Sequence, residues 1–301
     1  MLAAIFCGAF AHADAQQATS ELRIGVVTPT GAPTSRQMSA LRGVRLGASE
    51  AMQTARLFGD AVELYEASGD GKTRRALAAA MFLSSVRKVQ VLIGIDSGAA
   101  ESLARFANQR GIIFLNIASR SDSFRLLCGT TFHIEASDHM YAAAARLRAD
   151  LLTGSGSAGR GTDSVVLWHP TLERFGASQL NDRYSAAFHV GMDGGAWAGW
   201  AAVKFVAEAV LRVRSTQPMK LRAYLLASTT QFDGHKGWPL SFRPLDHQLR
   251  QPLYIVVQSA AGVRAVDVPD LRSISSATSD RAAIDALDRL APSESCSTRG
   301  D

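Results

Sequence analysis

Two short segments carry groups that could bind a charged small molecule. Ser97 stands directly before Gly98 and Ala99 at the expected start of a helix. Unpaired backbone N–H groups and the positive end of the helix dipole attract anions at such a position. The second segment contains Arg120, whose planar guanidinium can pair with a carboxylate through two parallel hydrogen bonds. The plainer alternatives are a helix cap at Ser97 and a surface loop in which Arg120 pairs with Asp122.

A third polar group lies between residues 133 and 139 and could be interpreted as a set of metal ligands. His133 and Glu135 share one face of a short predicted strand. Asp138 and His139 belong to the following turn, where Ser137 or Asp138 more plausibly caps a helix. We therefore expect no metal site in this segment.

Sequence motifs of catalysis are absent. The chain has no Gly-x-Ser-x-Gly elbow, no phosphate-loop lysine and no dinucleotide fingerprint after its first strand. We therefore expect no catalytic residue, no cofactor and no enzymatic activity. Lys and Arg exceed Asp and Glu by 32 to 27, but the basic residues are scattered and do not alternate with aromatic ones. This pattern argues against nucleic-acid binding.

The first residues have the pattern of an export signal. An apolar run from Leu2 to Phe10 is followed by Ala11-His12-Ala13 and Ala13-Asp14-Ala15, each with small residues at the spacing that signal peptidase requires. We expect a signal peptide at 1–15 and a periplasmic mature chain, although no basic residue precedes the run. No other segment approaches the ~18 apolar residues of a membrane span, so the chain is not expected to be embedded in a membrane.

Three cysteines are present, and one of them, Cys7, lies in the expected signal peptide. Cys128 and Cys296 could pair in an oxidising compartment. Because Cys296 lies in a Ser-rich terminal tail, we favour the interpretation that the two remain unpaired.

Strands and helices alternate through the first half of the chain. Periodicity predicts strands at 22–27, 61–65, 89–94, 112–116 and 132–134, and helices at 38–52, 73–86, 99–109 and 139–151. This order is typical of an α/β fold with a parallel sheet and helices on both faces. Ligands bind such sheets at the carboxyl ends of the strands. Here those ends are the loops at 28–34, 96–99 and 118–123.

The second half follows a Gly- and Ser-rich stretch, Thr153 to Thr162, which we interpret as a linker. It is predicted to contain a strand at 165–168, helices at 172–188, 197–213 and 218–227, and a β region with segments at 253–258 and 263–268. Trp197, Trp200, Phe205 and Val206 recur at helical spacing and are expected in the core.

Taken in order, these segments resemble the type I periplasmic binding proteins of the branched-chain amino acid group. The resemblance is carried by Ile24–Gly31, Arg42–Ala48, Val91–Gly98 and Gly111–Ser121. Further segments resemble the narrower subgroup encoded beside quinoprotein (PQQ-dependent) alcohol dehydrogenases: Trp168–Pro170, Glu173–Gly176, Phe232–Gly237 and Pro239–Pro244.

The resemblance implies a type I fold in which the second lobe is truncated, because the linker stands where most of that lobe would be. The implied division is a signal peptide at 1–15, a first segment of lobe 1 at 16–152, a linker at 153–164, a return segment of lobe 1 at 165–230, a remnant of lobe 2 with the crossover at 231–272, and a flexible tail at 273–301.

The resemblance also implies a function and a ligand site. The function is the substrate-binding component of an ABC transporter, with a small polar or anionic solute (amino-acid-like or a carboxylate) and a membrane permease as partners. The implied ligand-binding residues are Asp96, Ser97, Gly98, Ala118, Ser119 and Arg120. Arg120 departs from the family's pattern of small residues and would favour an anion such as a carboxylate over an aliphatic side chain. The alternatives are an accessory or sensor protein of an alcohol dehydrogenase system and a deletion product with impaired binding.

Overall fold

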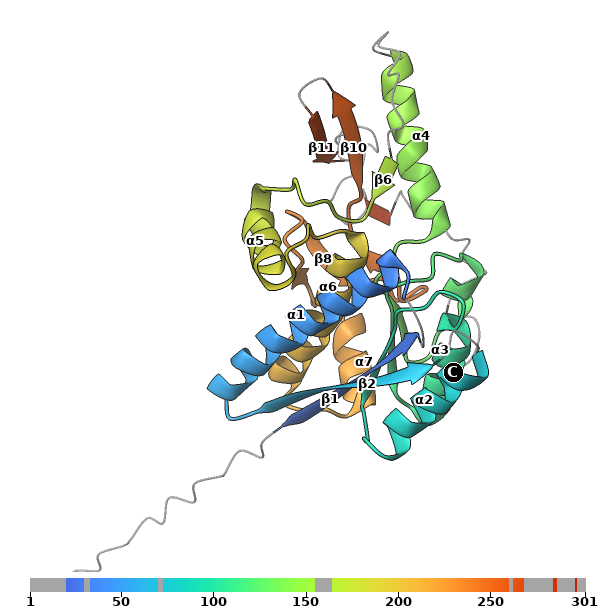
Figure 1. The fold of residues 1–301 in the computed structure, drawn as a ribbon. Coiled ribbons are helices and arrows are strands. Elements are labelled where there is room, and N and C mark those ends of the chain that lie inside the picture. Colours follow the sequence, from blue (N-terminus) through green and yellow to red (C-terminus); the bar gives the residue numbers. More distant parts are fainter. Residues whose placement is uncertain are drawn as a thin grey trace, which may run out of the picture.

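A five-stranded parallel sheet forms the centre of the molecule (Figure 1). The computed structural model describes residues 20–29, 33–69, 73–154, 164–259, 262–267, 284–285 and 296. The strands follow the order β2-β1-β3-β4-β5. Their bounds are β1 Glu21–Pro29, β2 Ala61–Gly69, β3 Val91–Gly94, β4 Ile113–Asn116 and β5 Thr131–His133. Each strand predicted in the first half is therefore present.

Helices cover both faces of this sheet, as the alternation of elements predicts. α1 (Ser35–Leu57) and α6 (Gly194–Val213) pack on one face, and α2 (Thr73–Ser85) and α3 (Ala100–Arg110) on the other. Neighbouring residues of a strand alternate between the two apolar layers, so Val91 and Ile93 belong to one layer and Leu92 to the other.

The second half of the chain adds helices and two small sheets. The first half ends with the 3-10 turn η1 Ser123–Leu126 and with α4 Asp138–Gly154. The elements of the second half are β6 Ser164–Val166, η2 Arg174–Gly176, α5 Ala177–Phe188, α7 Pro218–Leu226, β7 Phe232–Asp233, β8 Pro239–Phe242, β9 Leu249–Arg250, β10 Tyr254–Ser259 and β11 Gly262–Asp267, together with α6. The helix predicted at 172–188 begins only at Ala177, because Phe175 and Gly176 have φ angles of 58° and 81°. Two consecutive left-handed residues cannot continue an α-helix.

The three-stranded antiparallel sheet β11-β10-β6 stands beside α4, beyond the end of the large sheet (Figure 1). The predicted hairpin is formed by β10 and β11. The expected signal peptide, most of the expected linker and nearly all of the expected tail lie outside the described residues.

Glycines allow α1 and α6 to pack with their backbones in contact. A Cβ atom on Gly43 would lie 1.9 Å from the carbonyl oxygen of Ala196, and one on Gly199 would lie 2.3 Å from the carbonyl oxygen of Ala40. The aromatic stripe of α6 is buried, as predicted, with Trp197, Trp200, Phe205 and Val206 at most 1% exposed. The contact therefore fixes a helix from the second half of the chain onto the first.

A disulfide joins Cys128 to Cys296, so the expectation that these cysteines remain unpaired was wrong. The backbone N–H of Cys296 also donates to the carbonyl oxygen of Leu245 at 2.7 Å, which holds this end of the chain against the folded core. The two cysteines are 168 residues apart, and local sequence composition carries no information about a contact at that separation.

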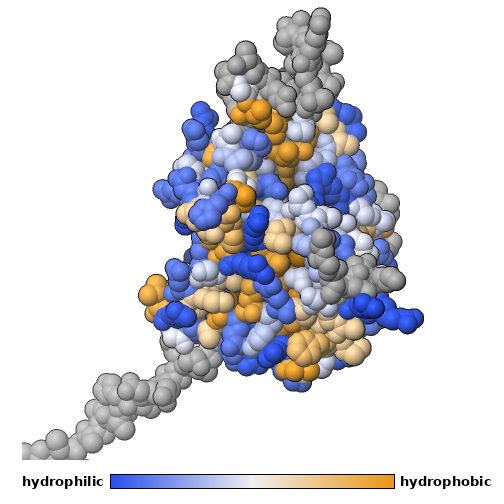
Figure 2. Space-filling view, in the orientation of Figure 1, coloured by the Kyte–Doolittle hydropathy of each residue, from blue (hydrophilic) through white to orange (hydrophobic). Residues whose placement is uncertain are grey.

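The surface drawn in Figure 2 shows hydrophobic side chains in several separate areas, with hydrophilic side chains between them. Among the described residues, every helix is too short or too polar to cross a membrane.

Gly43→Ala should destabilise the protein by about 3 kcal/mol or more, because the added methyl group overlaps the backbone of α6 and the helices must separate. Gly195→Ala is the matched control, since its added Cβ would lie no closer than 3.3 Å to a neighbouring atom. Urea unfolding followed by circular dichroism measures both variants. Equal stability of the two would contradict the backbone contact.

Removal of the disulfide by Cys128→Ser should lower the free energy of unfolding by about 2–5 kcal/mol, because the unfolded chain regains the entropy of a long open loop. The same unfolding experiment with a reducing agent should shift the wild type to the stability of the variant. A reducing agent that also weakens the variant would point to a different cause.

Candidate functional site

The carboxyl ends of four strands are in register at one edge of the large sheet. Val27 pairs with Gly94, Gly94 with Asn116, and Asn116 with His133. The loops that follow these residues are therefore neighbours, and they include both segments in which ligand contacts are predicted.

Asn116, the last residue of β4, shapes the loop that carries Ala118 and Ser119. Its Oδ1 atom accepts hydrogen bonds from the backbone N–H groups of Ala118 at 3.2 Å and Ser119 at 2.9 Å. Its Nδ2 atom donates to the carbonyl oxygen of Ser119 at 2.8 Å. One buried amide thus ties the turn down at three points.

Arg125 holds the same loop from the other side and is only 1% exposed. Its Nη1 atom donates to the carbonyl oxygens of Ser119 at 2.8 Å and Ser121 at 2.9 Å. Its Nη2 atom donates to the carbonyl oxygen of Glu135 at 2.7 Å, and its Nε atom to Gln248 at 3.0 Å. No sequence motif singles out Arg125, because its partners are backbone carbonyls and a distant side chain.

Glu135 is the carboxylate that the two arginines of this edge approach, and it is fully buried. One carboxylate oxygen accepts from Arg36 Nη2 at 2.7 Å, and the other accepts from the hydroxyl of Tyr141 at 2.8 Å. Arg120 lies over the ring of Tyr141, with its Cζ atom 3.8 Å from the ring centroid and its Nε atom 3.6 Å from Glu135. Burial, and then the neighbouring carboxylate, raise the pKa of Tyr141 well above its usual value.

The arrangement leaves an excess of positive charge facing solvent. Two guanidinium charges, Arg36 and Arg120, stand against the single carboxylate of Glu135, so one positive charge remains. The side chains of Arg36 and Arg120 are 45% and 37% exposed, whereas that of Glu135 is 1% exposed. The alternative pairing of Arg120 with Asp122 was wrong, because the carboxylate that lies near Arg120 is that of Glu135, while Asp122 accepts the backbone N–H of His139.

The segment Asp96–Gly98 is bonded within itself. The backbone N–H of Gly98 donates to Asp96 Oδ1 at 3.0 Å. The residue that caps α3 is Ala99, so the alternative role of Ser97 as a helix cap was wrong. An acidic side chain thus already occupies one of the amides that we expected to attract an anion.

The residues considered as metal ligands have other partners. His133 Nδ1 lies 3.2 Å from the amide of Asn116, and Glu135 accepts a hydrogen bond from Arg36. Ser137 caps α4 by accepting the backbone N–H of Met140, as predicted. The described residues contain no group of three or more His, Cys, Asp or Glu side chains that could hold a metal ion.

Lys236 connects the two segments that lead to the small sheet. Its buried ammonium donates to the carbonyl oxygens of Leu167 at 2.9 Å and Pro252 at 3.1 Å and to the side chain of Gln251 at 2.9 Å. It also lies 3.9 Å from the centroid of the Trp197 ring. Burial lowers the pKa of Lys236, although these carbonyl, amide and ring contacts favour its charged form.

His133 makes stability depend on pH. Burial, and then the charge of Arg125, hold the pKa of His133 well below 6.5. The unfolded chain therefore binds the proton first, and stability present above pH 6.5 is lost as the pH falls below that value. Between about pH 7.5 and about pH 5.5, His133→Asn should lose less stability than the wild type, by on the order of 1 kcal/mol. Urea unfolding at the two pH values measures this difference, and equal losses would contradict it.

Comparisons with known proteins agree with this architecture. Residues 21–147 match the sequence model of a periplasmic binding protein family. No curated protein matches the chain. A solute-binding protein of an ABC transporter from R. palustris, solved with benzoate, is 14% identical, with a TM-score of 0.67 and coverage of 82% of this chain and 96% of that chain.

Two further solved structures are similar. A branched-chain amino acid ABC transporter periplasmic ligand-binding protein from Burkholderia xenovorans LB400 has 14% identity, a TM-score of 0.69 and coverage of 81% of this chain and 94% of its own. The substrate-binding protein of a branched-chain amino acid transporter from Streptococcus pneumoniae, solved with isoleucine, has 14% identity, a TM-score of 0.64 and coverage of 82% and 100%. The chain therefore has the fold of the type I periplasmic binding proteins.

Proposed function

We propose that the chain is a non-enzymatic, periplasmic substrate-binding component of an ABC transporter, and that its ligand is a small carboxylate. The observation that carries this proposal is the pair of half-exposed arginines, Arg36 and Arg120, that converge on the single buried carboxylate of Glu135. Their excess positive charge lies at the carboxyl edge of a parallel sheet, where ligands of such folds bind.

The ligands of the similar structures support the choice of a carboxylate. Benzoate and isoleucine, which are bound in two of them, have different side groups and share a carboxylate. A guanidinium pairs with that group through two parallel hydrogen bonds and is indifferent to the rest of the molecule. In this proposal Arg120 binds the shared carboxylate, and other contacts select the identity of the solute.

The remaining predicted ligand residues complete the proposed site. Ser119 and Ala118 lie on the loop that Asn116 and Arg125 hold in place, next to Arg120. Asp96, Ser97 and Gly98 follow the adjacent strand β3 and would meet the more distant part of the solute.

The proposal includes the export and the domain division inferred from the sequence. The chain would reach the periplasm through the signal peptide at 1–15, and a membrane permease would accept the solute from it. In this division β10 and β11 belong to the remnant of the second lobe with the crossover, and β6 lies where the linker passes into the return segment of lobe 1. The link to quinoprotein alcohol dehydrogenases stays a prediction from the sequence.

Arg120→Ala and Arg36→Ala should each weaken binding of a small carboxylate by about tenfold to a hundredfold, because each removes a charge-assisted hydrogen bond. Calorimetric titration of the chain from Gln16 onward with benzoate, isoleucine and other small carboxylates measures the change. Arg105→Ala is the matched control, since Arg105 pairs with Glu101 on the surface of α3.

Glu135→Gln tests the sign of the charge. The substitution keeps the shape of the side chain and frees both arginines, so carboxylate affinity should rise by about tenfold. A folded protein that binds no carboxylate in the panel, or an affinity that falls with Glu135→Gln while the fold is retained, would contradict the proposed function.

A further inference from the structure

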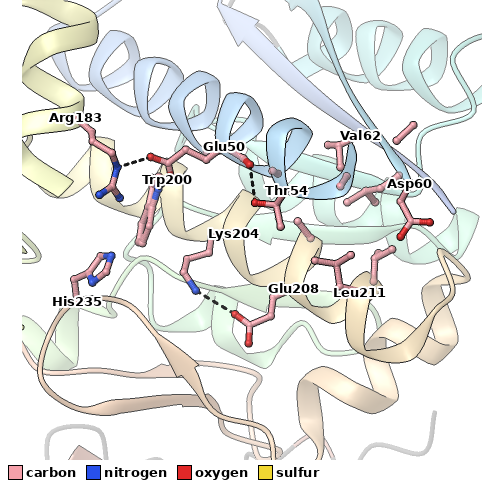
Figure 3. Close-up of a pocket in the computed structure, with 17 residues that line it drawn as sticks. Glu50, Thr54, Asp60, Val62, Arg183, Trp200, Lys204, Glu208, Leu211 and His235 are labelled. Carbon is pink, nitrogen blue, oxygen red and sulfur yellow. Dashed lines mark hydrogen bonds and ion pairs between the residues drawn. The ribbon is translucent and has the colours of Figure 1, made fainter. Parts of the chain in front are cut away.

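A cavity of about 280 Å³ lies between α1 and α6, near the amino ends of β1 and β2 (Figure 3). Leu22, Ala61 and Val62, which line it, belong to the first residues of these strands. The arginine site stands at the carboxyl ends of the strands. The cavity is therefore separate from the site proposed above and is not assigned by that function.

The cavity follows from the way in which the two helices pack. At Gly43 and Gly199 the backbones of α1 and α6 are in contact. Farther along, the facing residues include Ala51 and Ala55 on α1 and Ala207 on α6, whose small side chains line the cavity without filling it. Such an apolar space favours the binding of apolar molecules, because their transfer out of water is favourable.

Each charged group that lines the cavity is paired with a group of opposite sign, and one of them, Asp60, has its partner Arg214 outside the lining. Arg183 Nε donates to Glu50 at 2.7 Å, and Lys204 Nζ donates to Glu208 at 3.1 Å (Figure 3). The other carboxylate oxygen of Glu50 accepts from the indole N–H of Trp200 at 2.7 Å. Because these charges balance, an ionic ligand would leave water without gaining an unpaired partner.

The Lys204–Glu208 pair can still bind a polar group. An ammonium has three N–H donors, and among the described residues Lys204 uses one of them, on Glu208. A hydroxyl group can accept from Lys204 and donate to Glu208 at the same time. The cavity therefore offers an apolar volume with a position for a hydroxyl at the Lys204–Glu208 pair.

One end of the cavity is formed by His235, whose side chain is held by contacts with two other segments. Its ring stacks on Trp200 with centroids 5.4 Å apart, and its Nδ1 atom lies 3.2 Å from the carbonyl oxygen of Phe175. A Cβ atom on Gly176 would lie 2.9 Å from the same nitrogen. The segments 173–176 and 232–237, both singled out in the sequence, thus meet at this end and fix its shape.

We propose that this cavity is a second binding site, which takes a small uncharged molecule with an apolar ring and one hydroxyl group. The apolar lining accommodates the ring, the balanced charges exclude ions, and the Lys204–Glu208 pair binds the hydroxyl.

Three probes with the same carbon skeleton test the proposal: 2-phenylethanol, phenylacetate and 2-phenylethylamine. Calorimetric titration of the full mature chain should show saturable binding of the alcohol. The affinity of this site for each of the two ions should be lower than its affinity for the alcohol by about tenfold or more. Absence of alcohol binding, or equal binding of an ion in the same cavity, would overturn the proposal.

Filling variants locate the binding. Ala207→Leu and Thr54→Leu each place a larger side chain in the cavity and should lower alcohol affinity by about tenfold or more. Thr54 is exposed, so its variant should fold even if the buried Ala207 variant does not. Ala142→Leu, at an exposed position of α4, is the matched control and should bind normally.

Arg120→Ala separates this site from the one proposed for carboxylates. The variant should keep its affinity for 2-phenylethanol. Loss of alcohol binding in Arg120→Ala, or its persistence in both filling variants, would place the alcohol elsewhere and overturn the proposal. Failure of carboxylate binding alone would contradict only the proposed function.

Discussion

The backbone contact between α1 and α6 is the constraint on which the rest of the structure depends. Gly43 and Gly199 remove the side chains that would keep the helices apart, so carbonyl groups of one helix approach the backbone of the other. α6 comes from the second half of the chain, and this contact places it on the sheet built by the first half. The dry layer between them contains Trp197 and Trp200. Burial of such large rings contributes several kcal/mol to the packing of the second half of the chain on the first.

The same joining of the two halves builds the carboxyl edge. The family model matches only residues 21–147, yet the loops there are held by side chains from beyond that range. Gln248 accepts from Arg125 and donates to the carbonyl oxygens of His133 and Glu135. Gln251 donates to the carbonyl of Ile134 and accepts from Lys236. The geometry of the arginines is therefore a property of the whole chain, because each of these buried amides satisfies backbone groups that would otherwise lose hydrogen bonds.

The sequence predicts the parts of this structure that depend on local patterns. The strands and helices of the first half follow from apolar periodicity, and the cap at Ser137 from residue type. Three features escaped prediction, two because they depend on distant partners and one because of an unusual backbone conformation. Arg36 and Glu135 are 99 residues apart, and the two cysteines are 168 apart. The late start of α5 depends on Phe175, whose left-handed backbone no propensity predicts for an aromatic residue.

Glu135 explains how Arg36 and Arg120 can lie close together at the proposed site. A buried carboxylate is costly unless it is paired and hydrogen-bonded, and here Arg36 and Tyr141 meet that requirement. In return, the carboxylate neutralises part of the repulsion between Arg36 and Arg120 and holds their guanidinium groups at one place. A solute carboxylate would then meet preorganised donors, which lowers the entropic cost of binding. The same internal carboxylate would compete for those donors, so the affinity of the proposed site would be limited by the residue that organises it.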